Sequence, residues 1–102
     1  MSYGADQILK GKGDSDYERY IKTEDLLSLQ PEPETWKHRD ELLFTVVHQS
    51  SELWLKLAVA ECQQIVEYLK VGDLASALRL TPRIPMCVAN ATTALDMLEQ
   101  MS

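Results

Sequence analysis

The chain has 102 residues, of which 45% are hydrophobic and 25% are charged, and its formal net charge is −6. This length fits one small domain, and the composition excludes collagen, low-complexity chains and wholesale disorder. The acidic balance, without a cluster of Lys and Arg, argues against binding to nucleic acid or to an anionic membrane surface.

Two further classes are disfavoured by the order of the residues. No apolar run approaches the roughly 20 residues that span a bilayer, and the first residues lack the apolar stretch of a secretory signal. Cys62 and Cys87 show neither CxxC spacing nor a Cys/His pattern typical of metal ligands. We therefore expect a cytoplasmic protein with two reduced cysteines that bind no metal; the alternative is a disulfide or a metal role for them.

In the first third of the chain, the residue pattern predicts a tail followed by a short helix. Residues 1–16 hold three of the four glycines and are expected to form a flexible N-terminal tail. In the next stretch, residues 17–30, Thr23 is predicted to cap a helical turn over residues 24–29. The sequence PEPE at 31–34 should end that turn, because proline lacks a backbone N–H and restricts the preceding residue.

A long helix is predicted in the centre of the chain. Residues 35–71 contain no Gly and no Pro, and their apolar side chains recur at helical spacing. Gly72 is expected to end this helix in the left-handed conformation, and Asp73 to cap the next helix. The fold class is therefore all-α, with a long central helix plus shorter helices.

The second half of the chain leaves two alternatives open. Pro82 and Pro85 either stop the second helix near Leu80 or kink it, so that it resumes as far as Met101.

The central helix is too long for the rest of the chain to cover. About 35 residues at 1.5 Å per residue give roughly 50 Å, whereas a globule of this chain length has a radius of gyration of only about 13 Å. The apolar positions of the helix also wrap around more than one face. We therefore expect a partner: another copy, a second chain or the rest of a larger protein.

His48 is the most informative titratable residue. Phe44 lies one turn before it and Glu52 one turn after it, so all three follow one stripe of the helix. A buried imidazole beside an aromatic ring can orient a ligand N–H or accept a proton. The alternative is a core histidine bonded to a backbone carbonyl or hydroxyl. His38, at the polar start of the helix, is expected to be exposed.

Tyr17 and Tyr20 lie three residues apart, just after the predicted tail. They either attach the tail to the body of the domain or contribute to a binding site.

Two stretches carry the resemblance to a known family. The stretch DELLFTVVHQSSELWLKL, residues 40–57, closely resembles the signature of tryptophan 2,3-dioxygenases. The stretch YERYIKTEDLLSLQ, residues 17–30, resembles the N-terminal segment of the same family. The last stretch, LDMLEQMS, is similar to the helix that leads to the family's substrate-carboxylate site. The resemblance covers residues 17–102, which we expect to form the N-terminal part of such a helical domain.

The resemblance implies an all-helical haem dioxygenase. Such enzymes insert both atoms of O₂ across the C2–C3 bond of the indole of L-tryptophan and release N-formylkynurenine. It gives His48 the role of the distal histidine that hydrogen-bonds the indole N–H. It makes Phe44 an aromatic wall of the same pocket, and both side chains would border the haem. Tyr17, Tyr20 and Ile21 would reach into the pocket of a neighbouring subunit of a homotetramer.

The resemblance also implies an incomplete site. The family's proximal haem histidine and its carboxylate-binding arginine are expected beyond Ser102, so the axial ligand would lie outside this chain. The chain alone would then be inactive and would need the C-terminal portion of the enzyme or a second chain. Two alternatives stay open: a related haem enzyme acting on a modified indole or a tyrosine-like ring, and a non-enzymatic helical oligomerisation module.

Overall fold

The computed structural model describes residues 9–101, and it is helical with no strand in that range. This confirms the predicted all-α class. The chain divides into two compact units, Met1–Lys37 and His38–Ser102, each of which is described by itself. Within residues 9–101 no helix is both long enough and apolar enough to cross a membrane.

The first unit contains α1 (Asp16–Ile21), α2 (Thr23–Leu27) and the 3₁₀ turn η1 (Pro33–Thr35). Ser15 caps α1, because its buried hydroxyl accepts the Glu18 backbone N–H at 3.2 Å. Helix α2 ends at Leu27, before the proline-rich stretch at 31–34 that was predicted to end it, and Pro33 instead begins the 3₁₀ turn.

The predicted cap at Thr23 is wrong. Lys22, with φ of 60°, adopts the left-handed conformation that ends α1 and occupies the cap position of α2. The backbone of Thr23 is therefore already helical, and its hydroxyl makes no capping bond. That hydroxyl is buried without a hydrogen-bond partner among the described residues.

A loop over residues 9–15 folds against α1. Arg19 donates hydrogen bonds to the carbonyl oxygens of Leu9 at 2.7 Å and Gly13 at 3.0 Å. Gly13 has φ of 114°, and a Cβ there would lie 2.7 Å from the Cβ of Glu18, so only glycine fits. Residues 1–8 of the predicted tail lie outside the described residues, and the flexibility of residues 1–16 stays a prediction.

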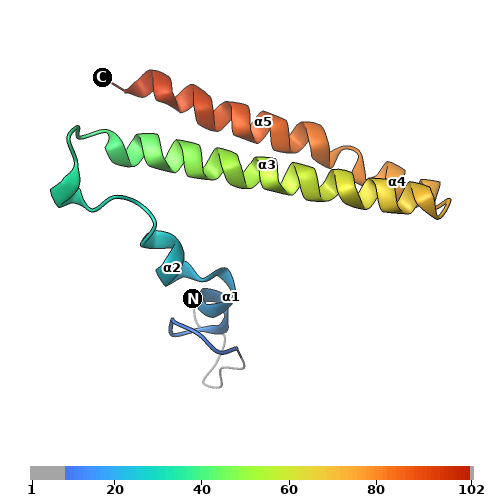
Figure 1. Ribbon diagram of the computed structural model, residues 1–102, viewed down its shortest axis with the longest axis horizontal. Helices are drawn as coiled ribbons and strands as arrows, with labels where there is room; N and C mark the ends of the chain where they lie inside the picture. Colours follow the sequence, from blue (N-terminus) through green and yellow to red (C-terminus); the bar gives the residue numbers. More distant parts are fainter. Residues whose placement is uncertain (1–8, 102) are drawn as a thin grey trace. The chain divides into compact units, whose positions relative to one another are not determined.

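The second unit is a helical hairpin. It consists of α3 (Glu41–Lys70), α4 (Leu74–Leu80), α5 (Arg83–Asp96) and the 3₁₀ turn η2 (Met97–Gln100). Figure 1 shows α4 and α5 returning alongside α3. The first arm of the hairpin is α3, the second arm consists of α4 and α5, and the two arms are antiparallel. The long helix begins later than predicted, since residues 35–40 pass through the 3₁₀ turn, an extended residue and a second turn.

The turn between α3 and α4 follows the prediction. Gly72 has φ of 77°, in the left-handed region that glycine adopts without strain. Asp73 caps α4 by accepting the Ser76 backbone N–H at 3.1 Å.

The two prolines interrupt the second arm without ending it. Helix α4 ends at Leu80, as in the first alternative, and a helix resumes at Arg83, as in the second, but α5 ends at Asp96 and a 3₁₀ turn follows in place of helix as far as Met101. Pro82 stands at the cap position of α5. Pro85 is its third residue, where a backbone N–H would have no partner within the helix. Pro85 therefore removes no helical hydrogen bond.

A heptad-spaced stripe of buried and half-buried residues joins the two arms. Each arm contributes side chains alternately three and four residues apart, the spacing of an antiparallel coiled coil. On the second arm this spacing continues from α4 through the proline turn into α5. The stripe consists of Val47, Ser51, Trp54, Ala58, Glu61, Ile65 and Tyr68 on the first arm, and Ala77, Leu80, Ile84, Cys87, Ala91, Ala94, Leu98 and Met101 on the second.

Small side chains at the middle of the stripe bring the helices close together. Ser51, Ala58, Cys87 and Ala91 are all buried. The hydroxyl of Ser51 donates to the Val47 carbonyl at 2.7 Å and lies 3.5 Å from the carbonyl oxygen of Ala91 on the facing helix. A larger side chain here would have to push the two backbones apart.

This close approach predicts a position-specific effect of enlarging an alanine. Ala91→Leu should lower the free energy of unfolding by about 1–3 kcal/mol, because the added atoms have no space between α3 and α5. Ala89→Leu, two residues away on the exposed side of α5, is the matched control and should change it little. Urea unfolding followed by helical circular dichroism measures both, and equal losses would show that the stripe is not tightly packed.

The Asp73 cap predicts a pH effect at the start of α4. Hydrogen bonds from the Ser76 side chain, and then from its backbone N–H, lower the pKa of Asp73 below its ordinary value of 3.8. The stabilisation is therefore present above pH 3.8 and is lost as the pH falls through the lower pKa of the folded chain. Hydrogen exchange should show the protection factor of the Ser76 amide falling in that range. Asp73→Asn keeps an acceptor that does not titrate, so an identical fall in this variant would contradict the account.

Candidate functional site

Helix α3 has more apolar surface than its partner arm covers. Beyond the stripe that faces α4 and α5, exposed apolar side chains line both flanks of α3. One flank has a groove of about 320 Å³ lined by Ser50, Leu53, Trp54 and Leu57. We call the other flank the His48 flank; it consists of Phe44, His48, Leu55, Val59, Cys62 and Val66, all of them exposed.

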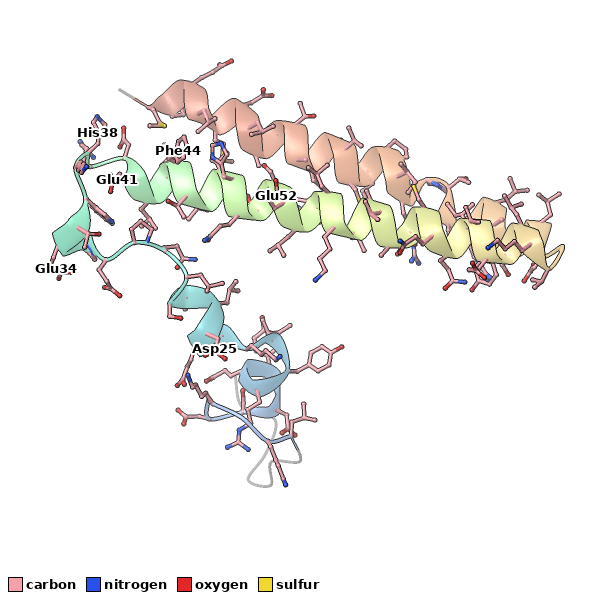
Figure 2. The ribbon with its side chains drawn as sticks, viewed as in Figure 1. Asp25, Glu34, His38, Glu41, Phe44 and Glu52 are labelled. Atoms are coloured by element: carbon pink, nitrogen blue, oxygen red, sulfur yellow. The ribbon has the colours of Figure 1, made fainter. Side chains whose placement is uncertain are left out.

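Phe44 and His48 form a defined pair on this flank. Their ring centroids lie 4.1 Å apart, with an angle of 31° between the ring planes. The pair results from the helical geometry, since residues four apart lie one above the other. Figure 2 shows Phe44 close to the start of α3, beyond Glu41, with Glu52 farther along the helix. The sequence-predicted neighbours are therefore brought onto one side of the helix.

A hydrogen bond fixes the protonation pattern of the His48 ring. Nδ1 of His48 lies 2.7 Å from the carbonyl oxygen of Phe44. A carbonyl oxygen only accepts, so Nδ1 carries the hydrogen and donates it. In the neutral ring Nε2 is then the acceptor. The side chain is thus prepared to accept a hydrogen bond from a ligand N–H.

The expected burial of His48 is wrong for this chain by itself. Its side chain is exposed, and the neighbouring Phe44 side chain is 49% exposed. The physical reason is that nothing within residues 38–101 covers this flank of α3. The alternative of a histidine bonded to a backbone carbonyl describes the Nδ1 bond correctly, but the residue is not in the core.

His38 differs from His48 in both position and hydrogen bonding. It is exposed, as predicted, and it precedes α3. Its Nδ1 accepts the Asp40 backbone N–H at 3.0 Å, so a neutral His38 ring carries its hydrogen on Nε2. This bond belongs to the turn that leads into α3 and occupies the side chain structurally.

Tyr17, Tyr20 and Ile21 belong to the first unit. All three side chains lie on α1 and are exposed, Tyr20 most of all at 75%. The structure brings these three residues together on one short helix. It brings Phe44 and His48 together on another helix in the second unit.

The His48 flank extends beyond the residues singled out in the sequence. Leu55, Val59 and Val66 continue the same side of α3 as His48. Their spacing of four and seven residues was the available signal, but the same residues also fit a core.

Within residues 9–101, no three His, Cys, Asp or Glu side chains are grouped so that they could hold a metal ion. Both cysteines are free thiols, Cys62 exposed and Cys87 buried.

Comparison with known proteins identifies the family. The family model described as tryptophan 2,3-dioxygenase matches residues 2–102. The chain belongs to the tryptophan 2,3-dioxygenase family. The resemblance carried by residues 40–57 is thereby confirmed.

Curated members of the family agree over most of the chain. A tryptophan 2,3-dioxygenase of an Arthrobacter species is 40% identical over 68 residues, which cover 67% of this chain and 24% of the relative. The tryptophan 2,3-dioxygenase of Kineococcus radiotolerans is 41% identical over 68 residues, which again cover 67% of this chain and 24% of the relative. That of Shewanella woodyi is 34% identical over 89 residues, covering 87% of this chain and 30% of the relative. No solved structure gave a significant match.

The chain therefore spans between about a quarter and a third of the length of these relatives. Most of a family member's residues have no counterpart in it.

The two histidines predict opposite tautomers. In the neutral rings, His48 should carry hydrogen on Nδ1 and His38 on Nε2, because the first donates to a carbonyl and the second accepts from an amide. Two-bond ¹H–¹⁵N correlation spectra distinguish the two forms, and His38 is the internal control. Phe44→Ala keeps the backbone acceptor and should leave the His48 tautomer unchanged. A hydrogen on Nε2 of His48 would contradict the proposed acceptor.

Proposed function

We propose that this chain is the N-terminal part of a haem-dependent tryptophan 2,3-dioxygenase. Its substrates would be L-tryptophan and O₂, and the product N-formylkynurenine, formed by adding both oxygen atoms across the indole C2–C3 bond. The observation that carries the proposal is the Nδ1–H bond of His48 to the Phe44 carbonyl, on an uncovered apolar flank of α3. It leaves one imidazole acceptor beside an aromatic ring.

In this proposal His48 binds and orients the substrate. Its Nε2 accepts the indole N–H, while the Phe44 carbonyl holds the ring through Nδ1. A ring fixed from one side loses little rotational freedom when it binds the ligand on the other. The hydrogen bond from the indole N–H to Nε2 would thus fix the position of the indole relative to the reacting oxygen.

Phe44 and the apolar residues of the His48 flank provide the wall of the pocket. A flat aromatic ring such as indole packs well against a phenyl ring and against aliphatic side chains. The same surface excludes water from the reacting groups. When bound, haem supplies the oxygen chemistry. The flank fits one wall of a haem pocket, which Phe44 and His48 would border, and the axial ligand is proposed to come from outside this chain.

The proposal assigns the rest of the site to other chains or segments. The exposed side chains of Tyr17, Tyr20 and Ile21 would reach into the pocket of a neighbouring copy in a homotetramer. The C-terminal portion of the enzyme, or a second chain, would cover the His48 flank and supply the proximal histidine and the carboxylate-binding arginine. Residues 17–102 would then be inactive alone, and the cytoplasmic location stays a prediction.

The role of His48 is tested in an assembled enzyme, made by joining this chain to the C-terminal portion of the Shewanella woodyi relative. With L-tryptophan, His48→Ala should lower kcat/KM by about 5- to 150-fold, the effect of about 1–3 kcal/mol for a lost buried hydrogen bond. His38→Ala is the matched control and should change kcat/KM little. Formation of N-formylkynurenine and haem absorbance are followed together, so that loss of haem is recognised.

A substrate without the indole N–H separates the hydrogen bond from other effects. The unsubstituted enzyme should use 1-methyl-L-tryptophan less well than L-tryptophan, and His48→Ala should narrow this difference because the partner of the N–H is gone. An unchanged ratio of the two substrates in the variant would refute the role of His48. Preference for another aromatic amino acid would favour a related haem enzyme, and a stable assembly indifferent to haemin would favour a non-enzymatic module.

A further inference from the structure

A polar groove lies near the other end of the hairpin from His48. It has a volume of about 570 Å³ and opens between α3, α4 and the start of α5. Its polar lining consists of Glu61, Gln64, Tyr68, Arg79 and Arg83. At a rise of 1.5 Å per residue, about 20 Å of helix axis separates Glu61 from His48. The groove is therefore distinct from the proposed tryptophan pocket.

Arg83, one of the two cations that line the groove, is held in place by Glu61, the only carboxylate among the lining residues. Nη1 of Arg83 lies 3.2 and 3.3 Å from the two carboxylate oxygens of Glu61. The Glu61 side chain is only 14% exposed, whereas that of Arg83 is 53% exposed. A single nitrogen serves both oxygens, and the Arg83 side chain makes no other hydrogen bond within the described residues. The rest of the guanidinium group is left for a ligand.

The second cation, Arg79, forms no salt bridge among residues 9–101, although the Asp73 carboxylate attracts it electrostatically. Arg79 donates through Nη2 to the Ser76 hydroxyl at 3.2 Å, and no carboxylate lies within ion-pair distance of it among residues 9–101. The lining of the groove thus contains two guanidinium groups and one carboxylate, with the Asp73 carboxylate outside the lining. These two cations lie together in a chain whose formal net charge is −6. Two guanidinium groups at one hollow favour a small anion.

We propose that this groove binds a small organic carboxylate. The planar fork of Arg79 matches the two oxygens of a carboxylate, and the free edge of Arg83 can complete the contact. Gln64 and Tyr68 add neutral donors at the side of the groove, and Leu80 offers apolar surface for the ligand body. The apolar surface of Leu80 favours an organic carboxylate over inorganic phosphate, which has no apolar body.

The test is an NMR titration of the 102-residue chain with benzoate at constant ionic strength. We expect saturable shifts at the groove residues, with a Kd near 1 mM, as for a single exposed charge-assisted contact. Arg79→Gln should weaken binding about tenfold. Arg39→Gln is the matched control, since Arg39 is exposed in the same unit and pairs with Asp40 outside the groove; it should leave the Kd unchanged.

Further probes decide between specific recognition and general charge effects. Benzamide has the same shape as benzoate without the charge, and its titration should show no saturable shifts. Inorganic phosphate should bind more weakly than benzoate. Arg79→Lys keeps the charge but loses the fork, and it should bind benzoate less tightly than the parent chain. The amides of Cys87 and Ala91 report that each variant keeps the hairpin. Absence of saturable shifts, equal binding of phosphate, or an equal loss in Arg39→Gln would overturn the proposal.

Discussion

The structure depends on the close contact between α3 and the returning arm of the hairpin. Ser51 and Ala58 face Cys87 and Ala91, and these small side chains allow the helices to approach until Ser51 lies near the facing backbone. A helix presents only one stripe to a single neighbour. Helix α3 can therefore cover only part of its apolar surface within this chain, and both of its flanks stay available for other contacts.

The same constraint explains why the proposed pocket wall is exposed. The His48 flank is apolar and contains one oriented imidazole, which is unusual for a surface that faces water permanently. The relatives are three to four times as long as the region they share with this chain. A covering segment from a longer chain or another copy would complete the burial of this flank. The hydrogen bond to the Phe44 carbonyl already orients His48 before any such segment is present.

The sequence predicted the helical class and the turn between the helices of the second unit, because those features depend on local chemistry. Gly72 and Asp73 do what their residue types favour, and the pairing of Phe44 with His48 follows from spacing alone. Thr23 was misassigned because the left-handed conformation of Lys22, rare for a residue with a Cβ, moves the helix start by one residue. The exposure of His48 was missed because burial depends on which segments lie nearby, and periodicity cannot distinguish an uncovered apolar face from a covered one.

The unbroken heptad spacing across Pro82 has a consequence for how this region can change in length. Each residue of a helix turns the next by about 100°, so one residue inserted or removed at the Thr81–Pro82 turn would rotate all of α5 about its axis. Cys87 and Ala91 would leave the interface, and bulkier neighbours would replace them: Val88 and Thr92 after a deletion, Met86 and Asn90 after an insertion. The proline turn therefore tolerates a change of amino acid far better than a change in residue number. It behaves as a spacer of fixed length between two parts of one interface.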